Sequence, residues 1–169
     1  VEMRRRAFGP VQRTAKRLCD VLGAAILLVL TGPLLLGIAL AIRRQTGASA
    51  LFLQQRVGLH GREFTMYKFR TMRPDTDAYA PSPDTPDDER VTSVGRWLRR
   101  YSLDELPQLL NVLKGDMSIV GPRPEMPFLV EQYEPWQRRR LEALPGLTGL
   151  WQILGRKDLP LRDNIEYDF

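Results

Sequence analysis

The sequence predicts a mixed α/β fold that is mainly helical, with a hydrophobic N-terminal helix followed by a compact domain that contains a short β-hairpin. Three observations predict this class. An apolar run near the N-terminus is long enough to enter a membrane, two short stretches after it have the composition of strands, and later segments have the apolar spacing of helices. The 169 residues are 43% hydrophobic, which is enough for a core and argues against wholesale disorder.

The first 42 residues predict a basic segment followed by a membrane-associated helix. Residues 1–17 carry six Lys and Arg side chains and one acid. Residues 18–42 contain one charge, Asp20, close to the start of the run. This length is sufficient to cross a hydrocarbon core of about 30 Å, and it exceeds the apolar core of a signal peptide. The segment is therefore expected in a membrane.

The apolar run is interrupted at its centre by Gly32 and Pro33. A proline inside a helix removes a hydrogen bond and clashes with the preceding turn, so we expect a kink at these two residues. Both flanks are basic, since Arg43 and Arg44 follow the run directly, and basic flanks favour the cytoplasmic side. Two topologies fit: a kinked helix that dips into one leaflet and returns, or a spanning helix with a proline kink.

From residue 45 the composition is that of a soluble domain. Residues 50–55 and 63–69 predict two short strands, and the glycine-containing turn at 58–61 joins them into a hairpin. Residues 74–90 hold four prolines and six acids with few apolar residues, and predict a surface loop. The irregular spacing of these acids favours a solvated loop over a metal site.

Residues 102–114 predict the clearest helix of this domain. Ser102 is a suitable N-cap, Glu105 completes a capping box three residues later, and Gly115 is a stop signal. The expected apolar face consists of Leu103, Leu106, Leu110 and Leu113.

Shorter elements are expected on either side of this helix. Residues 93–101 predict a short basic helix. Residues 127–144 predict a further helix, whose three consecutive arginines at 138–140 are expected to form a solvated or headgroup-facing patch. A turn at 145–149 and a short apolar stretch at 150–154 follow.

The composition restricts the chemistry that this chain can perform. With one cysteine, Cys19, it has neither an internal disulfide nor a cysteine zinc cluster. With one histidine, His60, a histidine-rich metal site is excluded and a histidine-based triad is disfavoured. Catalysis would therefore use carboxylates, arginine, lysine and backbone groups. The net charge of +5 and the pI near 9.7 favour anionic partners such as lipid headgroups, nucleotides or nucleic acid.

Asp104 and Glu105 are the first candidates for a catalytic site. In the predicted helix they occupy the first turn, where free N–H groups and the helix dipole stabilise negative charge. An ionised aspartate is suited to nucleophilic attack, and adjacent carboxylates can hold a divalent cation that binds phosphate. Acids in a first turn are also ordinary capping residues, and this position alone favours that simpler role.

Three cationic side chains are candidates for phosphate binding. Arg123 lies between Pro122 and Pro124, which fix the backbone and suit bidentate phosphate recognition, although a structural ion pair fits equally well. Lys68 and Arg70 alternate with aromatic residues and are expected to share one face of a strand, either at a phosphate or on a solvated edge.

Several motifs, taken in order, resemble those of the bacterial sugar transferase family, and the resemblance covers residues 12–169. The motifs are KFRTM at 68–72, SLDELPQ at 102–108, NVLKGDMSIVGPRPE at 111–125, PGLTG at 145–149, and Gln152 followed by Gly155 and Arg156.

The resemblance implies a monotopic phosphoglycosyl transferase that transfers a sugar-1-phosphate from a nucleotide diphosphate sugar, expected to be a UDP-sugar, to polyprenyl (undecaprenyl) phosphate. This is the first membrane step in the synthesis of exopolysaccharide, O-antigen, capsule or glycoprotein glycans. Asp104 resembles the nucleophile that forms a covalent phosphosugar-aspartate, and Glu105 its partner, with Mg²⁺ bound at both. Arg123 matches a phosphate-contacting arginine of the family. Lys68, Arg70 and Arg156 are further expected phosphate contacts.

The resemblance also implies a re-entrant helix that breaks at Gly32 and Pro33 and leaves the membrane on the side it entered. Three segments are then expected: a basic interfacial segment at 1–17, the re-entrant helix at 18–44 and a catalytic domain at 45–169. The catalytic domain would lie on the cytoplasmic face of the inner membrane of a bacterium. The apolar helix leaves room for a homodimer in the bilayer.

One alternative is a membrane-anchored binding module that recognises anionic lipid or nucleotide sugar without catalysis. A nucleic-acid partner is supported by the pI alone. The sequence shows neither an aromatic stacking platform nor a recognition helix, so we expect no nucleic acid to bind.

Overall fold

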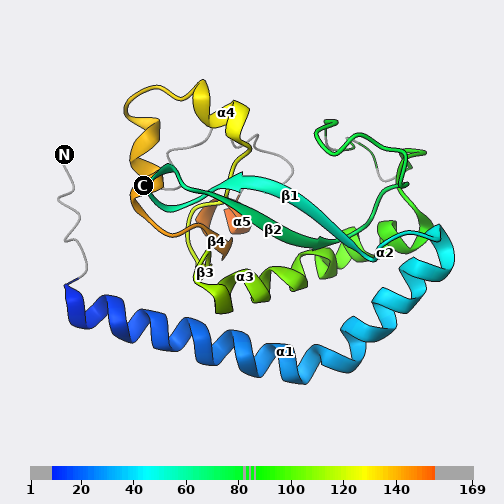
Figure 1. Cartoon of the computed structure of the whole chain (residues 1–169), viewed down its shortest axis with the longest axis horizontal. Coiled ribbons are helices and arrows are strands. Elements are labelled where there is room, and N and C mark those ends of the chain that lie inside the picture. Colours follow the sequence, from blue (N-terminus) through cyan, green and yellow to red (C-terminus); the bar gives the residue numbers. More distant parts are fainter. Residues whose placement is uncertain (1–8, 82, 84, 86, 155–169) are drawn as a thin grey trace.

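A computed structural model of the chain describes residues 9–154 except 82, 84 and 86. The predicted class is confirmed, since the fold is mixed α/β and mainly helical, with a long apolar helix and two small sheets. Figure 1 shows helix α1 extending along one side of all the other elements. With 3-10 helices labelled η, the elements are α1 (Pro10–Thr46), β1 (Leu51–Val57), η1 (Leu59–Gly61), β2 (Glu63–Phe69), α2 (Ser93–Tyr101), η2 (Leu103–Gln108), α3 (Leu109–Lys114), β3 (Ser118–Val120), α4 (Pro127–Glu131), η3 (Gln137–Glu142), β4 (Gly146–Thr148) and α5 (Leu150–Leu154).

Helix α1 is continuous and bent (Figure 1). Pro33 lies inside it and contributes no N–H to the helical hydrogen bonds. The Oγ1 of Thr31 donates to the carbonyl of Leu27 at 2.7 Å, and such a bond from a threonine to the preceding turn also favours bending. Proline and threonine together thus account for a bent helix that does not break.

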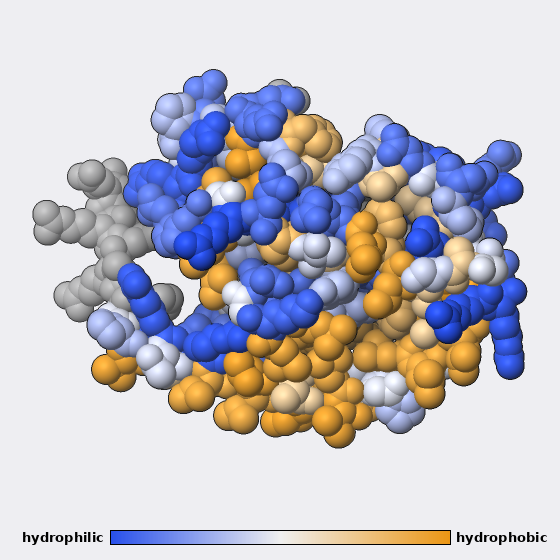
Figure 2. All heavy atoms as spheres, in the orientation of Figure 1, coloured by the Kyte–Doolittle hydropathy of each residue, from blue (hydrophilic) through white to orange (hydrophobic). Residues whose placement is uncertain are grey.

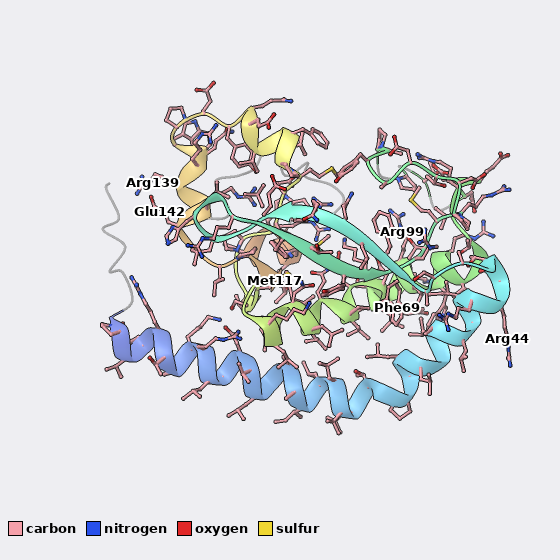
Figure 3. All side chains as sticks on the ribbon, viewed as in Figure 1. Arg44, Phe69, Arg99, Met117, Arg139 and Glu142 are labelled. Carbon is pink, nitrogen blue, oxygen red and sulfur yellow. The ribbon has the colours of Figure 1, made fainter. Side chains whose placement is uncertain are left out.

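Both halves of α1 pack against the same domain. In the N-terminal half, Ala24 is fully buried in a cluster with Leu109 and Met117. In the C-terminal half, Ile38 is buried in a second cluster with Phe69. Figure 3 shows Met117 and Phe69 between α1 and the hairpin. The hydrophobic core therefore lies along the inner face of the bent helix.

Polar contacts reinforce the docking of the N-terminal half. The carboxylate of Asp20 accepts hydrogen bonds from Lys16 Nζ at 3.0 Å, Ser118 Oγ at 2.9 Å and the backbone N–H of Ile119 at 3.1 Å. Arg17 donates to two carbonyls in the last turn of α3 at 2.6 and 2.9 Å. These bonds satisfy a buried carboxylate and the open end of a helix at once.

The outer face of α1 is apolar and exposed. By length and composition the helix could cross a membrane, and little of its apolar stretch is buried, unlike the core helix of a soluble protein. Figure 2 shows the resulting hydrophobic band along the edge of the molecule where α1 lies. The exposed apolar residues of this helix are Val11, Leu18, Leu22, Ile26, Leu27, Val29, Leu30, Leu34, Leu36 and Leu40.

The predicted hairpin is confirmed. Strand β2 has the predicted bounds, and β1 lies one residue later at its start and two residues later at its end than expected. The strands are antiparallel with Gln54 opposite Met66. The intervening turn contains the 3-10 helix η1, in which His60 adopts a left-handed conformation with φ 55°.

The outer edge of β2 is closed by the side chain of Asn111, which is fully buried. Its Nδ2 donates to the carbonyl of Thr65 at 2.8 Å, and its Oδ1 accepts from the N–H of Tyr67 at 3.0 Å. A carboxamide has the donors and acceptor of a peptide group, so Asn111 takes the place of a neighbouring strand. Nδ2 also donates to Asp116 at 3.1 Å. Helix α3 is thereby fixed against β2.

The prediction of one helix over 102–114 is wrong in its first half. Ser102 ends α2 with φ 57°, makes no capping hydrogen bond, and has a buried hydroxyl without a partner among the described residues, so the predicted capping box is absent. Residues 103–108 form a 3-10 helix, which has about 3.0 residues per turn instead of about 3.6. The apolar face consequently shifts: Leu109 is buried and Leu110 is exposed. Gly115 ends α3 as predicted, with φ 98°.

The predicted helix over 127–144 is also wrong. Only α4 and η3 form there, separated by residues 132–136. Pro135 explains the interruption, because it has no N–H and disfavours a helical conformation at the residue before it.

Two other predicted elements are confirmed. Helix α2 has its predicted bounds, and residues 150–154 form the short helix α5. The predicted turn at 145–149 contains strand β4, which pairs in parallel with β3. A Cβ at Gly146 would lie 2.1 Å from the nitrogen of Gly121, the residue after β3, so the backbone approaches this closely only because both positions are glycine.

We predict that Asn111→Leu destabilises the protein by about 2–4 kcal/mol, because it leaves the partly buried carbonyl of Thr65 and N–H of Tyr67 without the partner that Asn111 provides. The measurement is denaturant-induced unfolding in detergent. Gln55→Leu makes the same change from amide to alkyl at an exposed position of β1 and should have little effect. Equal stability of the two variants would show that Asn111 does not hold the strand edge.

Candidate active site

The predicted carboxylates lie in η2, between α2 and α3. Asp104 and Glu105 occupy its first turn, as expected, although this turn is 3-10 rather than α-helical. η2 packs against β2, the strand that carries Lys68. The hydrogen bonds of Asn111 fix this arrangement, because they bind α3, the continuation of η2, to the same strand.

Glu105 contacts two other predicted site residues, and the three come from separate segments of the chain. Its Oε1 accepts hydrogen bonds from Lys68 Nζ at 3.1 Å and from Arg123 Nη2 at 3.2 Å. Burial acts to raise the pKa of Glu105, but Lys68 and Arg123 outweigh it and lower this pKa to about 2. Burial in turn lowers the pKa of Lys68, an effect that Glu105 opposes. Glu105 is therefore ionised at any physiological pH.

Asp104 has the opposite electrostatic character. Burial raises the pKa of Asp104 above its ordinary value of 3.8; Lys68 opposes this effect and Glu105 adds to it. This direction differs from the stabilisation of charge expected at a helix N-terminus, because the loss of solvation on burial is the largest influence on the pKa of Asp104. In the described part of the chain no cation forms a salt bridge with Asp104. The two adjacent carboxylates thus differ: Glu105 forms salt bridges with two cations, and Asp104 forms none in the described part of the chain.

Two further arginines, neither of them predicted for the site, lie under the loop that carries Arg123. Arg56 in β1 is buried and donates to the carbonyl of Pro124 at 3.2 Å. Arg140 in η3 is buried and donates to the carbonyl of Arg123 at 2.7 Å. The guanidinium of Arg123 lies 5.7 Å from the ring centre of Trp151.

The interpretation of residues 138–140 as a uniformly solvated patch is wrong for Arg140. Figure 3 shows its neighbour Arg139 on the outside of η3, where a solvated side chain is expected. Three consecutive residues of a 3-10 helix point in three different directions, so only one of the three arginines can face the domain. Because the three residues are identical, the sequence does not show which one it is. For Arg56 a signal existed: strand alternation puts it on the same face of the hairpin as Lys68.

Two of the predicted phosphate contacts do not join this cluster. Arg70 follows β2, donates to the carbonyls of Ser49 at 2.9 Å and Leu51 at 3.4 Å, and lies 6.0 Å from the ring centre of Phe52. These contacts hold its side chain beside the start of β1 instead of at Glu105. Arg156 lies outside the described residues.

The donor set of the site fits Mg²⁺ only together with a bound substrate. In the described ranges, no group of three or more His, Cys, Asp or Glu side chains could hold a metal ion. Mg²⁺ is commonly bound by one or two carboxylates, with water and substrate phosphates completing its octahedron. Asp104 and Glu105 supply such a pair, and Lys68 and Arg123 add cationic donors suited to phosphate.

Comparisons with known proteins agree with the motifs. The chain matches the bacterial sugar transferase family over residues 11–169. It is 48% identical over 157 residues to the UDP-glucose:undecaprenyl-phosphate glucose-1-phosphate transferase of Caulobacter vibrioides, covering 89% of this chain and 59% of that protein.

Two other relatives are similar over most of this chain. The uncharacterized sugar transferase EpsL of Bacillus subtilis is 45% identical over 153 residues, which are 90% of this chain and 75% of that protein. The undecaprenyl-phosphate galactose phosphotransferase of Salmonella typhimurium is 39% identical over 171 residues, which are 92% of this chain and 36% of that protein. The family match spans nearly the whole chain and includes the segments that form the carboxylate and arginine site, so the chain belongs to the bacterial sugar transferase family.

Proposed function

We propose that this chain transfers a sugar-1-phosphate from a nucleotide diphosphate sugar, expected to be a UDP-sugar, to undecaprenyl phosphate, releasing a nucleoside monophosphate. The observation that carries the proposal is the pair of adjacent carboxylates with opposite pKa shifts, set among Lys68 and Arg123. Two relatives named for transfer to undecaprenyl phosphate, one of glucose-1-phosphate and one of galactose phosphate, support this reaction class. The reaction would begin the membrane-bound synthesis of an exopolysaccharide or related glycan.

Asp104 is the proposed nucleophile. A carboxylate oxygen attacks the phosphorus that carries the sugar, the bond from this phosphorus to the bridging oxygen breaks, and the nucleoside monophosphate leaves with that oxygen. An oxygen of the acceptor phosphate then attacks the same phosphorus and releases the aspartate. The absence of a salt bridge on Asp104 among the described residues supports this role, since no cation there already holds its oxygens.

Glu105 is proposed to organise the cations around the donor diphosphate. It holds Lys68 and Arg123 within 3.1 and 3.2 Å of one oxygen, so both cations are already positioned before substrate binds. Mg²⁺ held by Asp104 and Glu105 would neutralise charge on the diphosphate and on the leaving group. Arg123 and Lys68 would contact the phosphate oxygens directly.

We infer that α1 is re-entrant and that the chain is monotopic. A spanning helix has its ends on opposite sides of a hydrocarbon core of about 30 Å. Here Asp20 near one end bonds to Ser118, and Ile42 near the other end packs with Phe69, both in the same domain. Two ends docked on one domain favour a helix that enters one leaflet and returns. Basic residues on both flanks favour the cytoplasmic face of the inner membrane for this domain.

The central prediction is that Asp104→Asn reduces release of nucleoside monophosphate at least about 1,000-fold, because an amide is not a nucleophile. The assay uses detergent-solubilised protein, Mg²⁺, undecaprenyl phosphate and a panel of UDP-sugars, and EDTA should also stop release. Asp75→Asn, an exposed aspartate in the 74–90 loop, is the control that should retain activity. Equal release by both variants would refute the assignment, and sugar-nucleotide binding without release by the wild type would indicate a binding module.

The pH dependence follows from the raised pKa of Asp104. Activity requires the ionised carboxylate, so kcat/KM should fall on the acid side as pH drops through a value above 3.8. Glu105, with a pKa of about 2, does not titrate in this range. The charge of Arg99 lowers the pKa of Asp104, so Arg99→Gln should move the acid limb to higher pH. Arg96→Gln, an exposed change on the same helix, should not, and an unmoved limb in both would exclude Asp104 as the titrating group.

The topology can be tested with single cysteines introduced at exposed positions near each end of α1, Val11→Cys and Arg44→Cys, in a Cys19→Ser background. A re-entrant helix predicts that a membrane-impermeant maleimide labels neither cysteine in intact spheroplasts and labels both after permeabilisation. Labelling of one end from outside would instead establish a spanning helix.

A further inference from the structure

The loop that carries Arg123 is anchored through its carbonyls. Pro122 and Pro124 have no N–H, so this loop has lost two of the donors that usually fix a backbone. All four consecutive carbonyls from 122 to 125 nevertheless accept hydrogen bonds from other elements. The outer two bind backbone N–H groups, that of Gly146 at 2.8 Å and that of Val57 at 2.8 Å. The inner two bind buried guanidinium groups.

Arg140 supplies the donor to the carbonyl of Arg123. It is 3% exposed, and its Nη2 reaches that oxygen at 2.7 Å. Its Nη1 donates to the hydroxyl of Tyr133, whose ring centre lies 5.7 Å from the guanidinium carbon. The guanidinium of Arg140 is therefore held by hydrogen bonds at two of its nitrogens.

Arg56 supplies the donor to the carbonyl of Pro124. It is 8% exposed, and its Nη1 reaches that oxygen at 3.2 Å. Its Nε and Nη2 both donate to Gln54 Oε1, at 3.1 and 2.7 Å, and Glu125 lies 4.0 Å from Nη1. A planar guanidinium with a fixed fork of donors can make all these bonds at once, whereas a lysine ammonium cannot.

We propose that Arg56 and Arg140 are positioning residues for Arg123. By holding the carbonyls of Arg123 and Pro124, they keep the guanidinium of Arg123 at Glu105, ready for the donor diphosphate. This inference rests on the proposed function, because the phosphate contact of Arg123 belongs to it. Burying two charged side chains is costly, and here their hydrogen bonds to the loop carbonyls, to Gln54 and to Tyr133 offset that cost. Arg123 is the side chain that this loop presents to the carboxylates.

The test is a double-mutant cycle with Arg123→Ala. Arg140→Lys and Arg56→Lys keep the charge but lose the fork, and each should reduce kcat/KM for nucleoside monophosphate release roughly 10- to 100-fold. In the Arg123→Ala background the same changes should cost less than about twofold further, because the residue they position is gone. Arg139→Lys, on the outside of η3 in Figure 3, is the control and should behave as wild type.

Losses that multiply in full in the Arg123→Ala background would overturn the proposal, since they would reflect a general role in folding. Unfolding midpoints are measured for each variant. If Arg140→Lys does not fold, Tyr133→Phe removes only the hydroxyl that orients Arg140, and the same cycle is run with that variant. The cycle is also measured as Kd for UDP by calorimetry. Wild-type protein that binds UDP without turnover would contradict the proposed function while still testing the positioning of Arg123.

Discussion

The side chain of Asn111 joins the hairpin to the helical segment that carries both acidic residues. A strand edge that has no neighbouring strand needs other partners for its N–H and C=O groups. Here one carboxamide supplies them with two hydrogen bonds to β2. Because Asn111 belongs to α3, this edge can be satisfied only when η2 and α3 lie against the strand. Lys68 on β2 then faces Glu105 on η2. A requirement of backbone hydrogen bonding thus determines which charges meet.

The two carboxylates at this site differ in their surroundings, and their pKa values shift in opposite directions. Glu105 shares one oxygen between two cations, so the gain from charge exceeds the cost of burial. Asp104, one residue away, has burial without a salt bridge among the described residues, and its pKa moves upward. This difference fits the separate roles proposed for these adjacent carboxylates, Glu105 as an organiser of cations and Asp104 as the nucleophile.

What the sequence could predict depended on the range of the interactions involved. Helix α2, strand β2 and the end of α3 at Gly115 follow from local composition and were predicted at their observed bounds. The identity of Asp104, Glu105, Lys68 and Arg123 as site candidates came from local motifs, and three of these residues do meet. The 3-10 geometry of η2, the burial of Arg140 and the pairing of β3 with β4 depend on distant contacts. A three-residue strand has too few positions to show alternation, and a buried arginine differs from an exposed one only in what lies across from it.

The docking of α1 relates the membrane to this site. A helix attached to one domain at both halves, by Asp20 on one side of the bend and by Ile38 and Ile42 on the other, leaves its apolar outer face exposed. In the proposed re-entrant arrangement, the domain would be held against the membrane surface rather than tethered at a distance from it. The proposed two-step transfer through Asp104 would suit that position, because a water-soluble donor and a lipid-bound acceptor could react with the same carboxylate in turn. On this proposal, the bent helix and the carboxylate of Asp104 would together solve one physical problem, the joining of two substrates that dissolve in different phases.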